Sequence, residues 1–205
     1  MFFLPLLPPF NLHLIIFPEM FSTSFLTLVA LAATAIVQAI PLATRQANTC
    51  TPNAQGSGVS VVSLANPALE LGVATSSISG TRLVSSSFRG IAAPEFHIQQ
   101  DGQASFVVRD VTNNNLAVTF VTAQDLELQT ASNSGNNVNQ LWEITCNTCL
   151  TPGAPVTRGT VVGNNCRVRA RGNNLVCVNI GQSAGAPVSA SACNGGVAQE
   201  FKIVA

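Results

Sequence analysis

Hydrophobic and polar residues alternate in short runs over most of the second half of the chain. Three of these runs share an aromatic residue, one polar residue and then Ile, at residues 96–98, 142–144 and 201–203. Alternate side chains of a β-strand point to opposite faces, so the pattern predicts half-buried strands with the aromatic residue and Ile on the inner face. We therefore expect Phe96, Trp142 and Phe201 to lie in one core.

Each of these strands is preceded by similar features at a similar distance. An alternating strand leads through an Asn-containing turn into a second strand entered at Leu69, Leu116 or Leu175. The spacing is nearly equal from Val61 to Phe96, from Val107 to Trp142 and from Val168 to Phe201. Shared ends and shared length predict three related units of about 40 residues each.

The three units are expected at about residues 57–98, 104–144 and 165–204. Each would hold about four short strands, too few to bury a hydrophobic face alone. We therefore predict an all-β domain in which the units stack around a pseudo-threefold axis. Residues 145–164 lie between the second and third units, and we predict a Cys-containing loop insertion there, held by a disulfide.

The first 45 residues differ from the rest. Residues 25–40 are almost wholly apolar and contain Val37-Gln38-Ala39, a small-residue pattern that a signal peptidase cleaves. We expect residues 1–45 to be a signal peptide and a short propeptide, and residues 46–205 to be the mature domain. An uncleaved membrane anchor is the alternative. After cleavage we expect no membrane association and a secreted, extracellular protein.

Charge is sparse along the whole chain. Only 9% of the residues are charged and the formal net charge is zero, against about 25% charged residues in an average soluble protein. Without a basic stripe there is no electrostatic basis for binding nucleic acid.

The six cysteines lie beyond the expected signal peptide, and their even number predicts three disulfides. Cys146 and Cys149 have the spacing of a zinc-ligand pair, but no second such pair follows and only His97 remains as an imidazole after cleavage. A structural zinc site needs four ligands, so we expect no metal. The pairing of Cys50, Cys146, Cys149 and Cys166 stays open at this stage.

Catalytic groups are also few. Nucleophilic catalysis needs a base beside the nucleophile, and the expected mature chain offers only His97. Glu95, Glu143 and Glu200 occupy related positions in the three units, which indicates solvated strand faces or turns. We therefore expect neither an enzyme nor a bound cofactor.

The third unit resembles a repeat of the ricin B-chain-like lectins. Cys177-Val-Asn179, a Gly-x-x-Val segment at 185–188, Cys193 and Gln199-Glu-Phe201 follow the pattern of that family. The second unit supplies a full Gln-x-Trp at residues 140–142, whereas the first unit keeps only Phe96. The resemblance implies a β-trefoil fold and a disulfide between Cys177 and Cys193.

The sugar site of that family uses an Asp two residues after the first Cys, and a ring two residues before the second. Asn179 and Ser191 occupy these positions in the third unit, so the ring is missing. The Asp positions of the first and second units lie close to Val73 and Phe120, and Phe88 and Phe120 are the candidate exposed rings. The resemblance implies a site in the third unit, formed by Asn179, Ser191, Asn194 and Gln199.

The resemblance therefore implies a monomeric carbohydrate-binding module with a glycan or glycoprotein as partner. Two other functions remain open. The segment 150–165 contains Arg158 between cysteines and prolines, as in a substrate-like loop of a β-trefoil protease inhibitor. The low charge and abundant Ser, Thr and Asn also suit a cell-wall or matrix protein without a discrete ligand.

Overall fold

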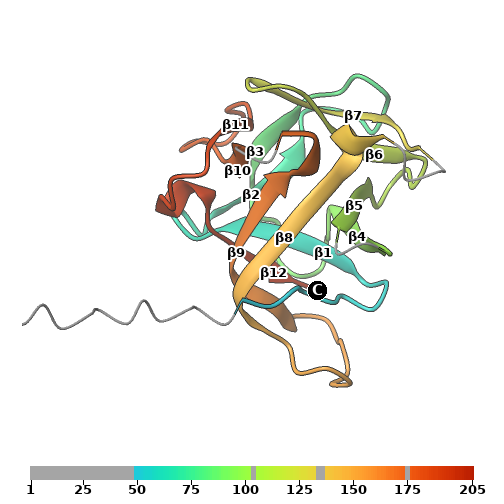
Figure 1. Cartoon of the computed structure of the whole chain (residues 1–205), viewed down its shortest axis with the longest axis vertical. Coiled ribbons are helices and arrows are strands. Elements are labelled where there is room, and N and C mark those ends of the chain that lie inside the picture. Colours follow the sequence, from blue (N-terminus) through green and yellow to red (C-terminus); the bar gives the residue numbers. More distant parts are fainter. Residues whose placement is uncertain (1–48, 103–104, 133–136, 174–175) are drawn as a thin grey trace, which may run out of the picture. The chain divides into compact units, whose positions relative to one another are not determined.

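The computed structural model describes residues 49–205 except 103–104, 133–136 and 174–175 (Figure 1). The expected signal peptide and propeptide at residues 1–45, and the strand entry at Leu175, lie outside the described residues. Short 3₁₀ turns are the helical elements of this part of the chain: η1 (Val138–Gln140), η2 (Arg171–Asn173) and η3 (Val197–Gln199). No helix within the described residues is long and apolar enough to cross a membrane.

Twelve strands make up the described structure, four in each unit. The first unit holds β1 (Gly58–Ser63), β2 (Leu69–Val73), β3 (Leu83–Ser87) and β4 (Phe96–Asp101). The second holds β5 (Ser105–Asp110), β6 (Leu116–Thr122), β7 (Asp125–Thr130) and β8 (Leu141–Cys149). The third holds β9 (Val161–Ala170), β10 (Val176–Asn179), β11 (Ser189–Ala192) and β12 (Phe201–Val204).

The first and last strands of the units close into a six-stranded ring. β1 pairs with β4, β4 with β5, β5 with β8, β8 with β9, β9 with β12, and β12 returns to β1. The middle strands form the hairpins β2–β3, β6–β7 and β10–β11. The hairpins are joined by backbone hydrogen bonds such as Gly80 N to Leu128 O and Ala190 N to Ala123 O. The fold is therefore a β-trefoil, as the sequence predicted.

The strand register shows which residues of the three units are equivalent. Val59 lies opposite Phe96, Phe106 opposite Trp142, and Cys166 opposite Phe201. By this register Val108, and not the predicted Val107, is the counterpart of Val61 and Val168. Val107 packs instead in a small separate cluster with Leu141. Two adjacent valines fit the sequence pattern equally well, so only the pairing distinguishes them.

The repeated aromatic residues meet in the core. Phe96, Trp142 and Phe201 are at most 1% exposed, and the isoleucines two residues after them are also buried. Trp142 Nε1 donates a hydrogen bond of 3.0 Å to the carbonyl oxygen of Val118, which satisfies the one polar group of the indole. The predicted inner face of these strands is confirmed.

Strands extend from both ends into the predicted loop at 145–164, so the loop is shorter than expected. β8 continues to Cys149 and β9 begins at Val161, with Cys146 opposite Cys166 and Thr148 opposite Asn164. Only residues 150–160 form a loop, which lies at the lower end of the molecule in Figure 1. The disulfide-linked, directly opposed cysteines favour continued pairing over a free loop.

Three disulfides are present, as predicted from the six cysteines: Cys50–Cys149, Cys146–Cys166 and Cys177–Cys193. The first joins the N-terminal segment to the end of β8. Cys50 and Cys146 also exchange backbone hydrogen bonds of 2.9 and 2.8 Å. Among the described residues, no group of three or more potential ligands could hold a metal ion.

Candidate functional site

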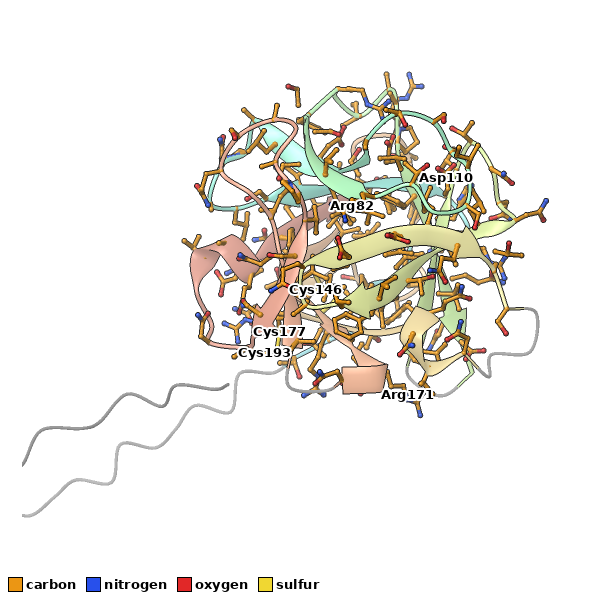
Figure 2. All side chains as sticks on the ribbon, turned by 90° about the horizontal axis from the view of Figure 1, so that it is seen from above. Arg82, Asp110, Cys146, Arg171, Cys177 and Cys193 are labelled. Atoms are coloured by element: carbon orange, nitrogen blue, oxygen red, sulfur yellow. A yellow bond between two sulfur atoms is a disulfide. The ribbon has the colours of Figure 1, made fainter. Side chains whose placement is uncertain are left out.

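The β10–β11 hairpin brings polar residues of the third unit to one face. Cys177 lies opposite Ser191 and Asn179 opposite Ser189. Directly opposed residues of an antiparallel pair point to the same side, and so do residues two apart on one strand. Asn179, Ser189 and Ser191 therefore share a face, with Ser191 exposed and Asn179 half-buried. The Cys177–Cys193 disulfide lies at one end of this hairpin (Figure 2).

The buried side chain of Gln199 connects the end of β11 with the segment that follows it. Its side chain is 2% exposed. Its Oε1 accepts from the backbone N of Asn194 at 3.1 Å, and its Nε2 donates to Ser191 Oγ at 2.9 Å and to Ala192 O at 3.0 Å. Both amide hydrogens are thus used within the chain. Gln199 positions Ser191 and Asn194, and its amide is not presented to a ligand.

Gln140 makes the equivalent contacts in the second unit. Its Oε1 accepts from Ser132 N at 2.8 Å, and its Nε2 donates to Thr119 Oγ1 at 3.1 Å and Thr130 O at 2.9 Å. The Gln140 side chain therefore has a structural role, which is to bond the backbone near the turn before the last strand. In both units the Gln side chain satisfies buried backbone groups that would otherwise lack partners.

The register also locates the counterparts of Asn179 in the other units. Arg109 opposite Ala117 and Arg169 opposite Cys177 make Thr119 the equivalent of Asn179. The prediction of Phe120 was therefore one residue off. Thr119 is buried and bonded to Gln140, so the second unit offers no polar group at this place.

In the first unit the counterpart is Gly72, one residue before the predicted Val73, because Val62 lies opposite Glu70. Glycine presents no side chain to a ligand. Phe120 packs against the core cluster, and Phe88 is half-buried. Neither predicted ring is fully exposed, and the third unit is the one whose polar side chain at the Asn179 position is only partly buried.

In the first unit a charged pair, Glu70 and Arg89, holds the loop before the last strand in place of a Gln. The sequence pattern did not indicate this pair. Pro94 stands at the Gln position, and Glu70 at the position of Cys177. Glu70 Oε1 accepts from the backbone N of Arg89 at 3.2 Å, the counterpart of the bond from Asn194 to Gln199. The Arg89 guanidinium also reaches Glu70 and Glu95. The available signal was a carboxylate inside the apolar run 69–71.

Replacing Glu70 by Ala is expected to lower the free energy of unfolding by about 1–3 kcal/mol, because the backbone N–H and the guanidinium of Arg89 both lose a buried, charged acceptor. The second unit has Ala117 at this position but supplies the acceptor from Gln140. Urea denaturation measures the loss. The control is Glu200→Ala, whose carboxylate pairs with the exposed Arg167 and is expected to contribute at most about 1 kcal/mol. Equal losses would contradict the role of Glu70.

The loop that carries Arg158 has a turn at its C-terminal end, just before β9. Thr160 N donates to Thr157 O at 2.9 Å, and Gly159 has a φ of +86°. Arg158 and Gly159 are therefore the corner residues of a tight turn. Arg158 is exposed at this turn, and the protease-inhibitor alternative stays a prediction.

No family model and no curated protein matches the sequence significantly. Among solved structures, the designed threefold-symmetric protein ThreeFoil matches with a TM-score of 0.54 and 18% identity, covering 72% of this chain and 97% of that one. The C-half of an earthworm R-type lectin, in complex with GalNAc, matches with a TM-score of 0.50 and 20% identity, covering 71% and 96%.

A mosquitocidal holotoxin matches with a TM-score of 0.56 and 15% identity over 73% of this chain. The match spans only 17% of the holotoxin, so it concerns one part of a much larger protein. Identities this low establish a common fold and nothing more. The chain shares the β-trefoil fold with a designed protein, an R-type lectin domain and part of a toxin.

Proposed function

We propose that the protein is a secreted, non-catalytic carbohydrate-binding module whose site is the β10–β11 face. The observation that carries this proposal is the arrangement of the third unit. The Cys177–Cys193 disulfide ties together the ends of the hairpin that carries Asn179 and Ser191, and the buried Gln199 bonds Ser191 and Asn194. The exposed Arg167–Glu200 ion pair lies beside Gly195, next to Asn194. The shared fold with an R-type lectin domain bound to GalNAc is consistent with this function.

The chemistry of these groups suits sugar hydroxyls. The Asn179 amide can donate and accept at once, as adjacent hydroxyls require, although it lacks the charge that strengthens a carboxylate contact. The disulfide and Gln199 fix the surface before binding, which reduces the entropy lost on association. No ring is available in this unit to stack on a pyranose, so we expect a dissociation constant of about 1 mM.

Three disulfides support secretion, since such bonds persist in oxidising compartments. The expected signal peptide at residues 1–45 fits the same location. In this proposal the protein is a monomer that binds a glycan or a glycoprotein and catalyses no reaction.

The test is retention of the protein, produced from the full chain in an oxidising host, on columns of galactose, N-acetylgalactosamine, mannose and chitin. We expect retardation on one of them and its loss in Asn179→Ala. The matched control is Asn115→Ala, an exposed amide of the second unit, which should be retained like the wild type. Equal retention of both variants would show that the β10–β11 face is not the site.

A further inference from the structure

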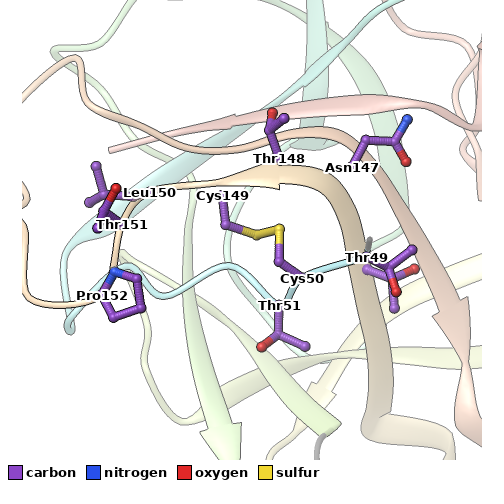
Figure 3. Close-up of a pocket in the computed structure, with 10 residues that line it drawn as sticks. Thr49, Cys50, Thr51, Asn147, Thr148, Cys149, Leu150, Thr151 and Pro152 are labelled. Carbon is purple, nitrogen blue, oxygen red and sulfur yellow. A yellow bond between two sulfur atoms is a disulfide. The ribbon is translucent and has the colours of Figure 1, made fainter. Parts of the chain in front are cut away.

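Three pockets lie next to one another along the N-terminal segment, residues 49–56. The largest, about 680 Å³, lies around the Cys50–Cys149 disulfide (Figure 3). A second of about 190 Å³ shares Thr51 and Pro152 with the first. A third of about 380 Å³ shares Asn53 and Gln100 with the second. The three pockets adjoin one another at these shared residues, and we refer to them together as the N-terminal groove.

The lining of the N-terminal groove is mostly polar, and His97 is its one ionisable side chain. It is drawn from residues 49–56, 97–100 and 145–152 together with Asn114, and it contains no Asp, Glu, Lys or Arg. Threonine hydroxyls and Asn and Gln amides dominate, and each can both donate and accept. Pro52, Leu150 and Pro152 add small apolar surfaces.

The groove is built by features that the trefoil itself does not need. β4 ends at Asp101 and β5 begins at Ser105, whereas β8 and β9 extend to Cys149 and Val161. The Cys50–Cys149 disulfide fixes the N-terminal segment against this extension. Gln55 Nε2 bonds Ala154 O at 2.9 Å across the groove. The β8–β9 extension is therefore fixed by a disulfide and by a hydrogen bond to the N-terminal segment. Binding surfaces are typically formed by such added segments on a rigid scaffold.

Gln55 also adopts a backbone conformation that is uncommon for a residue with a side chain. Its φ is +52°, in the left-handed region where non-glycine residues are rare. Its backbone N bonds Asn53 Oδ1 at 2.9 Å, which supports the conformation. The result is that Asn53 and Gln55 both line the two smaller pockets.

From this geometry we infer that the N-terminal groove binds a neutral, linear oligosaccharide along residues 49–56. Nucleic acid or an acidic glycan would require cationic groups to neutralise it, and the lining has no Lys or Arg. A lipid or apolar peptide would leave the amides without partners, at a cost for each buried polar group. A chain of uncharged hydroxyls with apolar C–H faces matches both the amides and the small apolar surfaces. This second site does not require the β10–β11 face to bind.

The test uses calorimetric titration of the protein, produced from the full chain, with chitohexaose, cellohexaose, laminarihexaose and mannohexaose and with the corresponding disaccharides. Because three adjoining pockets hold several sugar units, we expect one hexasaccharide to bind at least about 10-fold more tightly than its disaccharide. Two-dimensional NMR of the same mixture should show shifts concentrated in residues 49–56 and 145–152.

The variant Thr51→Ala/Gln100→Ala removes two exposed groups that each line two of the pockets. At about 1 kcal/mol for each hydrogen bond, it should weaken hexasaccharide binding about 10-fold or more. The matched control is Thr112→Ala/Gln124→Ala, exposed residues outside the groove, which should bind as the wild type does.

Absence of shifts in the groove with all four hexasaccharides would overturn the inference. So would hexasaccharide binding that is lost in Asn179→Ala and kept in Thr51→Ala/Gln100→Ala, although the proposed site in the third unit would then stand. The reverse pattern, with the groove variant weakened and Asn179→Ala unchanged, supports the groove and moves the site away from β10–β11.

Discussion

Removing the Cys50–Cys149 disulfide is expected to lower the free energy of unfolding by about 4–5 kcal/mol, the largest effect we predict. The two cysteines are separated by 99 residues in a chain of 205, so the bond closes a loop of about half of the unfolded chain. In the chain-entropy model the stabilisation grows with the logarithm of the closed loop. The double variant Cys50→Ala/Cys149→Ala removes the bond without leaving a free thiol to exchange with Cys146–Cys166.

The control for this prediction is Cys177→Ala/Cys193→Ala, which opens a separation of 16 residues and should cost about 3 kcal/mol. Urea unfolding of the two variants and the wild type gives the comparison. A smaller loss for the Cys50–Cys149 variant than for the Cys177–Cys193 variant would contradict the long-range restraint. It would mean that the N-terminal segment contributes little to the stability of the folded chain.

The second large effect is expected at Trp142. Trp142→Ala should lower the free energy of unfolding by about 3–5 kcal/mol, because the side chain is 1% exposed and its removal leaves a cavity at the centre of the core. Thermal unfolding followed by circular dichroism measures the change.

Trp142→Phe separates the two contributions of the indole. Phe96 and Phe201 fill the related positions of the other units, so a phenyl ring suits the site. The hydrogen bond from Trp142 Nε1 to Val118 O is nevertheless lost. A loss of about 1–3 kcal/mol is expected from the buried carbonyl left without a donor. If Trp142→Phe lost as much stability as Trp142→Ala, a phenyl ring would not replace the packing of the indole, and the account of two separable contributions would be wrong.

The fold could be predicted because the repeated alternation of apolar and polar residues reflects which side chains are buried. The aromatic residue and the Ile at 96–98, 142–144 and 201–203 are the inner-face residues of the last strand of each unit. The exact register could not be predicted, because Val107 and Val108 are both apolar and only strand pairing distinguishes them. The same uncertainty displaced the expected counterparts of Asn179 by one residue, from Gly72 and Thr119 to Val73 and Phe120.

The interactions that hold the loops were only partly visible in the sequence. Cys177–Cys193 was implied by resemblance, whereas the pairing of the other four cysteines depends on the path of the N-terminal segment beside β8. Gln199 was expected as a ligand residue, yet its amide hydrogens are consumed by Ser191 and Ala192. In the first unit Glu70 and Arg89 take the place of the disulfide and of the Gln side chain. No motif shared by the three units indicates this charged pair.

The N-terminal groove could not be predicted from local patterns at all. Its lining combines residues 49–56 with 97–100 and 145–152, which are distant in the sequence and meet only through the barrel and the Cys50–Cys149 bond. Threonine and asparagine in these segments are unremarkable taken singly. What indicates a site is the convergence of their hydroxyl and amide groups in adjoining pockets.

Binding to an array of neutral and anionic glycans at low and at high salt tests the central claim most directly. The account predicts binding of the folded, fully disulfide-bonded protein to at least one neutral glycan, with little change in strength at high salt, since a neutral ligand forms no ion pair for salt to screen. Failure to bind any glycan would contradict carbohydrate binding by this protein. Binding restricted to anionic glycans and abolished by salt would contradict both proposed sites.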